Sequence, residues 1–179
     1  MRIVFFTAMF LLTFSFAEQF ERLALPKELQ GNIIPNFFVL AGNNKDELYR
    51  DDLKINAKKA GAKRVVLSFF ATYCVSCREG FTVLKKNASE LEKQGVQVYL
   101  INVGEDIHVY GNKVSEMVKK HAGNFPFYFD PYGNSLDNFG FKEEIVLPLT
   151  LVLDSDLRAL GILVGSAGKD FPQVLWEEF

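Results

Sequence analysis

The chain has 179 residues, of which 49% are hydrophobic, and this is enough apolar material for one domain with a substantial core. Its formal net charge is −2, so no electrostatic attraction to nucleic acid or to an anionic membrane surface is expected. Only two cysteines are present, which argues against a secreted scaffold held together by several disulfides.

The first residues have the pattern of an export signal. Arg2 supplies a positive charge, Ile3 to Leu12 is almost entirely hydrophobic, and Ser15-Phe16-Ala17 offers the small residues that a signal peptidase reads. The apolar run is roughly 14 residues, short of the 20 or so that a spanning helix needs, so cleavage near Ala17 is favoured over a retained membrane anchor. We therefore expect a signal peptide over residues 1–17 and an exported, periplasmic protein without a stable membrane span.

After the signal, residues 18–33 predict a lead-in, because Pro26 and Gly31 discourage long regular structure. Residues 34–179 contain no internal repeat, low-complexity tract or linker, and so predict a single domain.

The first half of this domain alternates between strand and helix patterns. Residues 37–40 predict a short strand, and the polar residues 46–59 predict a loop or a short helix. Residues 65–70 are continuously apolar, with a length and β-branching that predict a strand buried on both faces. From Cys77 onward the apolar residues repeat at helical spacing, which predicts a helix that ends at Gly95.

The second half predicts a mixed sheet. The expected elements are a strand over 96–103, a helix ending near Gly123 with Val114, Met117, Val118 and His121 on its inner face, a strand over 125–129, a hairpin of strands over 149–153 and 159–164, and a closing helix from Asp170 to Phe179. Strands separated by helices should be parallel, and the hairpin must be antiparallel. The fold class is therefore α/β, with a mixed central β-sheet flanked by helices on both faces.

The reactive residues are expected where the buried strand ends. Cys74 lies at the start of the following helix, where free amides and the helix dipole favour a thiolate and lower the pKa of a cysteine from about 8.5. Cys77 lies one turn later, within reach of Cys74 for a disulfide. We expect Cys74 to be the exposed nucleophile and Cys77 the more buried resolving thiol. Arg78 either adds positive potential or is a solvated side chain.

Two other readings of the cysteine pair are disfavoured. Zinc needs about four ligands, and only His108 and His121 remain, without paired spacing, so no metal is expected. A structural disulfide across so short a segment would constrain the unfolded chain little. His121 is interpreted as helix packing near a helix C-terminus, where the dipole favours its charge, and His108 as solvated.

Several segments, in this order, resemble the TlpA/ResA-like thiol–disulfide oxidoreductases of the thioredoxin superfamily. The resemblance extends from Ile34 to about Gly165. It rests on Pro35-Asn36-Phe37-Phe38-Val39-Leu40, on Val65 to Arg78 with its F-F-A-T-Y-C-V-S-C motif, on Phe125-Pro126-Phe127 with Asp130, on Leu147 to Asp154, and on Gly165. It implies a thioredoxin-like fold for residues 34–179 and a redox-active disulfide between Cys74 and Cys77.

The resemblance also implies a site around that disulfide. Pro148 would carry a cis peptide bond facing the disulfide, and Leu147 would pair with the backbone of a substrate. Independently of the resemblance, the positions of Phe70 and Tyr73 beside Cys74 suggest an apolar rim there, with Tyr73 as a substrate-binding residue. The partners would be protein thiols or disulfides and an upstream protein electron donor, for example in cytochrome c maturation. No bound cofactor is implied, and we expect a monomer.

The motif departs from the family at four positions. Tyr73 replaces the usual tryptophan, and Ser76 replaces a common proline. Gly80 stands where reducing members carry a glutamate, with Glu79 one residue early, and Ser68 stands where thioredoxin has a buried aspartate. The proton acceptor for Cys77 and the direction of electron flow are therefore open.

Two further functions share parts of the pattern. A thiol peroxidase has the same opening strand, but it requires a P-x-x-x-T-x-x-C environment that residues 69–73 lack. A Sco-like copper-delivery protein requires C-x-x-x-C with a distant histidine, and here the cysteines are one residue too close.

Overall fold

The computed structural model describes residues 20–42, 46–142, 145–165 and 168–179. The predicted signal peptide and its cleavage point near Ala17 lie outside these ranges. Among the residues described, no helix is long and apolar enough to cross a membrane.

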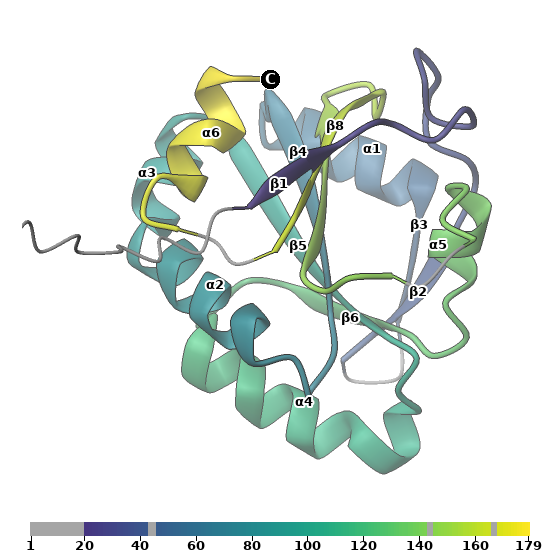
Figure 1. The fold of residues 1–179 in the computed structure, drawn as a ribbon, viewed down its shortest axis with the longest axis vertical. Helices are drawn as coiled ribbons and strands as arrows, with labels where there is room; N and C mark the ends of the chain where they lie inside the picture. Colours follow the sequence, from purple (N-terminus) through teal and green to yellow (C-terminus); the bar gives the residue numbers. More distant parts are fainter. Residues whose placement is uncertain (1–19, 43–45, 143–144, 166–167) are drawn as a thin grey trace, which may run out of the picture.

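One sheet runs through the domain, with the strand order β1-β8-β7-β4-β5-β6-β2-β3 (Figure 1). Its strands are β1 (Glu21–Leu23), β2 (Phe38–Ala41), β3 (Glu47–Tyr49), β4 (Arg64–Phe70), β5 (Val96–Val103), β6 (Phe127–Asp130), β7 (Leu149–Asp154) and β8 (Ala159–Val164). β4, β5 and β6 run parallel, whereas β7 is antiparallel to both β4 and β8. The predicted mixed sheet and its late hairpin are confirmed.

Helices cover both faces of the sheet (Figure 1). They are α1 (Arg50–Lys59), α2 (Val75–Lys86), α3 (Ala88–Lys93), α4 (Ile107–His121), α5 (Asn134–Asn138) and α6 (Phe171–Glu177). Buried residues of α1 and α5 join one hydrophobic cluster, and those of α2, α3, α4 and α6 join the other. Both faces of β4 are thereby buried, as its apolar run predicts.

Three elements lack a sequence signal of their own. β1 forms in the predicted lead-in, where all three of its side chains are exposed and its pairing with β8 defines it. β3 forms in the polar segment before α1 and pairs with β2. α5 follows the turn after β6, and its first amides are bonded by the buried carboxylate of Asp130. In each case the element is defined by pairing with another strand or by a local cap, and the periodicity of its side chains does not predict it.

The helix predicted from Cys77 to Gly95 is divided into α2 and α3. Asn87 separates them, and its side-chain amide donates to the carbonyl of Val83 at 2.9 Å. Such side-chain bonds to the backbone compete with helical hydrogen bonding and interrupt the helix. The predicted end holds, because Gly95 has a φ of 77°, a conformation that glycine adopts readily.

The sheet brings distant segments together at one end. β4 and β5 are parallel neighbours, so Phe70 and Asn102 lie side by side where both strands end. β7 runs the other way, and Leu149 at its start pairs with Phe69. We call this region, formed by residues 70–77, 102–105 and 147–149, the disulfide end of the sheet.

Candidate active site

A disulfide joins Cys74 and Cys77 at the N-terminus of α2, with their Cα atoms 5.3 Å apart. Cys74 is the N-cap residue of this helix and has extended backbone angles, with φ −75° and ψ 107°. Its sulfur accepts a hydrogen bond from the backbone N–H of Cys77 at 3.1 Å. The sulfur of Cys74 therefore lies where a helix terminus stabilises negative charge.

The two sulfurs differ in burial, although less than the sequence suggests. Cys77 is fully buried, and Cys74 is only 8% exposed. Cys74 was expected to be the exposed member of the pair, and it is the more accessible one, yet most of its surface is covered. Its neighbours Tyr73 and Val75 project outward instead, with exposed fractions of 72% and 63%. Cys74 thus keeps a small exposed surface between two prominent apolar side chains.

Two further side chains of α2 lie against Cys74 or the loop before it. The hydroxyl of Ser76 lies 3.7 Å from the sulfur of Cys74. The guanidinium of Arg78 donates to the backbone carbonyl of Thr72 at 2.8 Å. Of the two roles considered for Arg78, a purely solvated side chain is wrong, because Arg78 fixes the backbone two residues before the reactive cysteine.

The peptide bond between Leu147 and Pro148 is cis, as the resemblance implies. Pro148 immediately precedes Leu149, which pairs with Phe69, so the register places it beside the end of β4 and hence at the disulfide end. Its carbonyl accepts the N–H of Gly165 at 3.1 Å. Leu147 is partly buried and packs against the clusters on both faces of the sheet.

A buried carboxylate behind the disulfide loop has no counterpart in the sequence-based site. Glu105 is only 5% exposed and lies just after β5. It accepts the backbone N–H of Thr72 at 2.8 Å, the Thr72 hydroxyl at 2.5 Å, and the side-chain amide of Asn102 at 2.6 Å. The loop that leads into Cys74 is therefore bonded to the end of the neighbouring strand through one acidic side chain.

The hydrogen bond to this carboxylate fixes the orientation of the Asn102 side-chain amide. Its amide nitrogen also approaches the carbonyl of Phe70 at 3.4 Å, so turning the amide over would place its oxygen against two acceptors. Its own oxygen is buried and, within the described residues, accepts no hydrogen bond. Leaving such an acceptor without a partner costs about 1–3 kcal/mol. The disulfide end therefore contains a buried polar network in which one acceptor lacks a partner, and this lowers the net stabilisation that the network provides.

The positions of the usual proton acceptors contribute no acid. Gly80 and Ser68 are buried, and Glu79 is exposed on the surface of α2. Of the described acidic residues only Glu105 and Asp130 are buried, and Asp130 is bonded to residues at the start of α5.

The histidines are only partly as expected. His108 is exposed in the first turn of α4, in agreement with the expectation, and its backbone N–H is bonded by Asp106. His121 is partly buried at the other end of this helix, on the face of Val114 and Val118. Burial, together with the nearby charges of Lys120, Arg78 and Lys85, lowers the pKa of His121. This direction disfavours the charged form that a helix C-terminus would favour.

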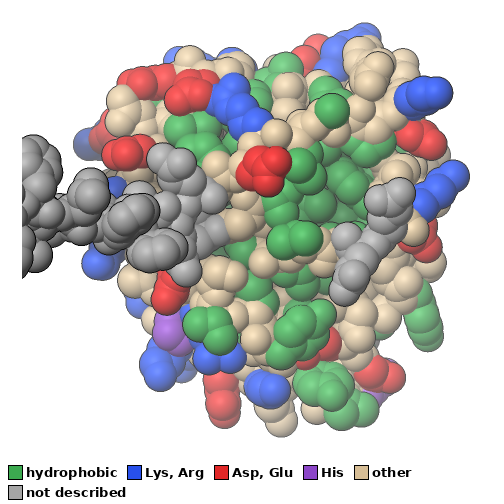
Figure 2. Space-filling view, viewed as in Figure 1, with side chains coloured by type: hydrophobic (Ala, Val, Ile, Leu, Met, Phe, Trp, Pro, Cys, Tyr) green, Lys and Arg blue, Asp and Glu red, His purple; other side chains and the backbone are tan. Residues whose placement is uncertain are grey.

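An apolar groove lies beside the cis proline. Its lining includes Leu23, Phe141, Ile145, Val146, Leu149 and Val164. It lies between β1, the start of β7 and the end of β8, and Figure 2 shows hydrophobic side chains exposed on the side of the molecule that carries β1 and β8. We call it the cis-proline groove. It could receive apolar side chains of a polypeptide next to Leu147.

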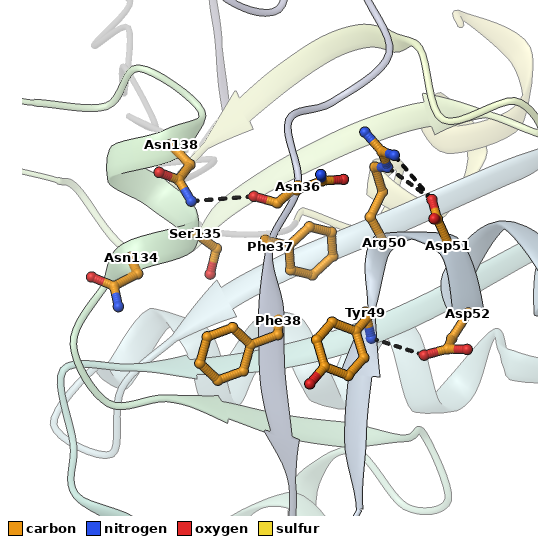
Figure 3. Close-up of a pocket in the computed structure, with 10 residues that line it drawn as sticks. All are labelled: Asn36, Phe37, Phe38, Tyr49, Arg50, Asp51, Asp52, Asn134, Ser135 and Asn138. Carbon is orange, nitrogen blue, oxygen red and sulfur yellow. Dashed lines mark hydrogen bonds and ion pairs between the residues drawn. The ribbon is translucent and has the colours of Figure 1, made fainter.

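A second hollow lies away from the sulfurs, at the β2–β3 side of the sheet (Figure 3). We call it the β2–β3 pocket, and its lining includes Phe38, Tyr49, Arg50, Asp51, Asp52 and Asn138. Its charged side chains are bonded to near neighbours: Arg50 to Asp51 at 3.0 Å, and Asp52 to the N–H of Tyr49 at 3.2 Å. None of the site residues expected from the sequence lines it.

Comparisons with known proteins agree with this geometry. The model of the AhpC/TSA family matches residues 26–159. The chain is 27% identical over 137 residues to the thiol-disulfide oxidoreductase ResA of Bacillus subtilis (strain 168), covering 76% of this chain and 68% of that protein. It is 25% identical over 146 residues to ResA of Geobacillus thermodenitrificans (strain NG80-2), covering 77% of this chain and 80% of that protein.

Solved structures show the same fold. A DsbF homologue from Corynebacterium diphtheriae superposes with a TM-score of 0.63 at 20% identity, over 93% of this chain and 96% of that chain. A thiol:disulfide interchange protein of the thioredoxin family from Chlorobium tepidum TLS has a TM-score of 0.61 at 20% identity, over 80% of this chain and 93% of that chain. The thioredoxin-like fold and the resemblance to the TlpA/ResA-like proteins are confirmed.

Proposed function

The chain belongs to the AhpC/TSA family, and we propose that, as a thiol–disulfide oxidoreductase, it exchanges electrons with exported proteins through Cys74 and Cys77. The observation that carries this proposal is the disulfide itself, placed at the N-terminus of α2 with the sulfur of Cys74 accepting an N–H from the helix. A helix terminus at this position stabilises the thiolate that must attack or leave during exchange.

The chemistry is a pair of thiol–disulfide exchanges. In the reduced protein, the thiolate of Cys74 attacks a substrate disulfide, forms a mixed disulfide and releases one substrate thiolate. Cys77 loses its proton, which the first released substrate thiolate can take up, and attacks the sulfur of Cys74; this closes the Cys74–Cys77 disulfide and releases the second substrate thiolate. Two electrons pass to the substrate, and two thiols of an upstream protein donor restore the dithiol. We propose this reducing direction, with no bound cofactor.

The assignment of the two sulfurs rests on burial. Cys77 is fully enclosed, whereas Cys74 reaches the surface, so an incoming protein sulfur meets Cys74 first. Cys77 then acts only within the molecule, as a resolving thiol.

Tyr73, Leu147 and Pro148 are proposed to bind the substrate. Tyr73 is 72% exposed next to Cys74 and offers a large apolar surface with a polar tip. Leu147 and Pro148 lie across from the end of β4, where an extended substrate segment could pair with the backbone of Leu147. The cis-proline groove would accept side chains of the same segment.

We further propose that residues 1–17 direct export and are removed, and that the mature protein acts as a periplasmic monomer. A reductant in this compartment would supply electrons to specific clients, for example to apocytochrome c during cytochrome c maturation. Mass spectrometry of the protein purified from its native compartment tests the cleavage, since a mature chain that begins at Glu18 is expected.

Trapping of mixed disulfides tests the central proposal. Cys77→Ser should accumulate mixed disulfides with client proteins through Cys74, because the resolving thiol is missing. The matched variant Cys74→Ser should accumulate few. The opposite result would reverse the two roles, and no trapped protein with either variant would refute exchange with protein thiols.

The direction of electron flow is tested by the reduction potential. A value near about −270 mV supports a reductant, and a value near about −120 mV supports an oxidant. A fast peroxide-consuming activity with a thiol donor, without exchange on protein disulfides, would instead assign the chain to thiol peroxidases.

A further inference from the structure

The buried carboxylate behind the disulfide loop has no role in the exchange steps described above. Glu105 lies at the end of β5, 33 residues from Thr72 in sequence, and yet it receives both hydrogen-bond donors of Thr72. Burying a carboxylate is costly unless its oxygens are bonded. A backbone loop could be held by a neutral side chain, so the use of an acid here calls for a reason in the chemistry of the site.

We propose that Glu105 is a positioning residue that holds the loop before Cys74 and keeps a negative charge behind it, which limits how readily Cys74 ionises. This inference rests on the proposed function only in taking Cys74 as the attacking thiol.

Glu105 lies close to the backbone of Cys74. The carboxylate lies 2.8 Å from the N–H of Thr72, and the two residues from there to Cys74 span at most about 7 Å. The backbone turns within this span, because the N–H of Cys74 donates to the carbonyl of Ala71 at 3.1 Å. Glu105 is thus about 10 Å or less from the backbone of the reactive cysteine.

Glu105 is also shielded from solvent. At this separation two charges in water interact weakly, but the interaction grows as the effective dielectric constant falls. Glu105, Asn102 and Cys77 are each 5% exposed or less, so little solvent screens the charge. Ions screen a buried pair much less than an exposed one.

Other charged groups lie near the disulfide end and also influence the ionisation of Cys74. Arg78 from α2 is bonded to the carbonyl of Thr72 and acts in the opposite sense to Glu105. Nearest to this end, the packed elements also carry Glu79 on α2, Asp106 and His108 at the start of α4, and Asp130 at the end of β6. The other acidic and basic residues of the two helices lie further along them: Lys85 and Lys86 on α2, and Lys113, Glu116, Lys119, Lys120 and His121 on α4. Glu79 and Asp106 are exposed, so solvent weakens their influence on Cys74.

The substitution Glu105→Gln tests the charge while preserving the contacts. Glutamine has the same length, its oxygen can accept the N–H of Thr72, and its amide can donate to the Thr72 hydroxyl. We expect the pKa of the Cys74 thiol in the reduced protein to fall by about half to one pH unit, because a repelling charge is removed. The matched control is Glu79→Gln, the same chemical change on the exposed surface of α2, which should move this pKa much less.

The readout is thiolate absorbance near 240 nm and the pH dependence of the alkylation rate. A second readout is the dithiol–disulfide equilibrium in glutathione buffers. At pH values below the thiol pKa, the equilibrium constant for disulfide formation should be the same in Glu105→Gln and in the wild type. At high pH, the constant of Glu105→Gln should be about three- to tenfold smaller than that of the wild type. A purely structural role would lower stability but would not produce a difference that grows with pH.

Equal thiol pKa values in Glu105→Gln and Glu79→Gln would overturn the inference. If Glu105→Gln does not fold, the wild-type protein still decides: the carboxyl ¹³C resonance of Glu105 should shift as Cys74 ionises, and a resonance unaffected by that ionisation would refute the coupling. These measurements need no client protein. A wild type that fails to reduce protein disulfides would therefore refute the proposed function, whatever Glu105 does.

Discussion

The disulfide end of the sheet and the β2–β3 pocket differ in what fills them. The pocket is open, and its charged groups bond to near neighbours such as the pair Arg50 and Asp51 (Figure 3). The disulfide end is nearly closed, with Cys74 only 8% exposed, and its polar groups bond across distant segments. The disulfide therefore lies where buried polar groups bond the loop before it to a neighbouring strand, and a hollow alone does not mark such a place.

The largest expected effect separates the two regions by activity. Cys74→Ser should reduce the rate of insulin disulfide reduction, with dithiothreitol as donor, by at least about a thousandfold, because no nucleophilic thiolate remains. The double variant Phe38→Ala/Tyr49→Ala in the β2–β3 pocket should stay within about twofold of the wild type. A comparable loss in the pocket variant would show that the pocket belongs to the active site.

The next effect separates the regions by stability. Phe81 is 1% exposed and packs edge-to-face on Phe70, with ring centroids 4.9 Å apart. Phe81→Ala should lower the free energy of unfolding by about 3–5 kcal/mol, measured by urea denaturation. Phe38→Ala removes a ring that is 48% exposed and should cost about 1 kcal/mol or less. Similar losses would contradict the contrast in packing.

A smaller difference is expected between two asparagines that each hold a neighbouring segment. Asn102→Ala removes a buried donor from the Glu105 carboxylate and should cost about 2–3 kcal/mol in unfolding free energy. Asn138→Ala removes an exposed bond of 3.2 Å to the carbonyl of Asn36 and should cost less than about 1 kcal/mol. The reverse order would mean that the buried network does not stabilise the fold.

The smallest expected effect is a pH dependence of stability that arises from His121, close to Arg78. Burial and neighbouring cations lower the pKa of His121, so the folded protein binds fewer protons at this site than the unfolded chain. Stability should therefore decline as pH falls below about 6.5, the ordinary value for histidine. His121→Gln should flatten this part of the profile in thermal unfolding between about pH 7.5 and pH 5. An unchanged profile would assign the acid sensitivity to other groups.

Much of the site was predictable because it is local in sequence. The strand 65–70, the cysteines after it and the helix that begins at Cys74 form one continuous segment, and its patterns predict all three. The motif around Pro148 could be placed only by resemblance, since a proline pattern alone does not indicate a cis bond. Glu105 was missed because a single acidic residue after a strand resembles any solvated loop residue.

The sequence alone determined the strand–helix order, the position of Cys74 at a helix start and the antiparallel β7–β8 hairpin, because apolar periodicity and turn residues act over a few neighbours. Only the tertiary structure decided that β1 joins β8, and that Asn102 and Glu105 bond to the loop before the disulfide. Those contacts depend on which strands lie side by side, and such pairings leave no periodic signal in the residues that make them.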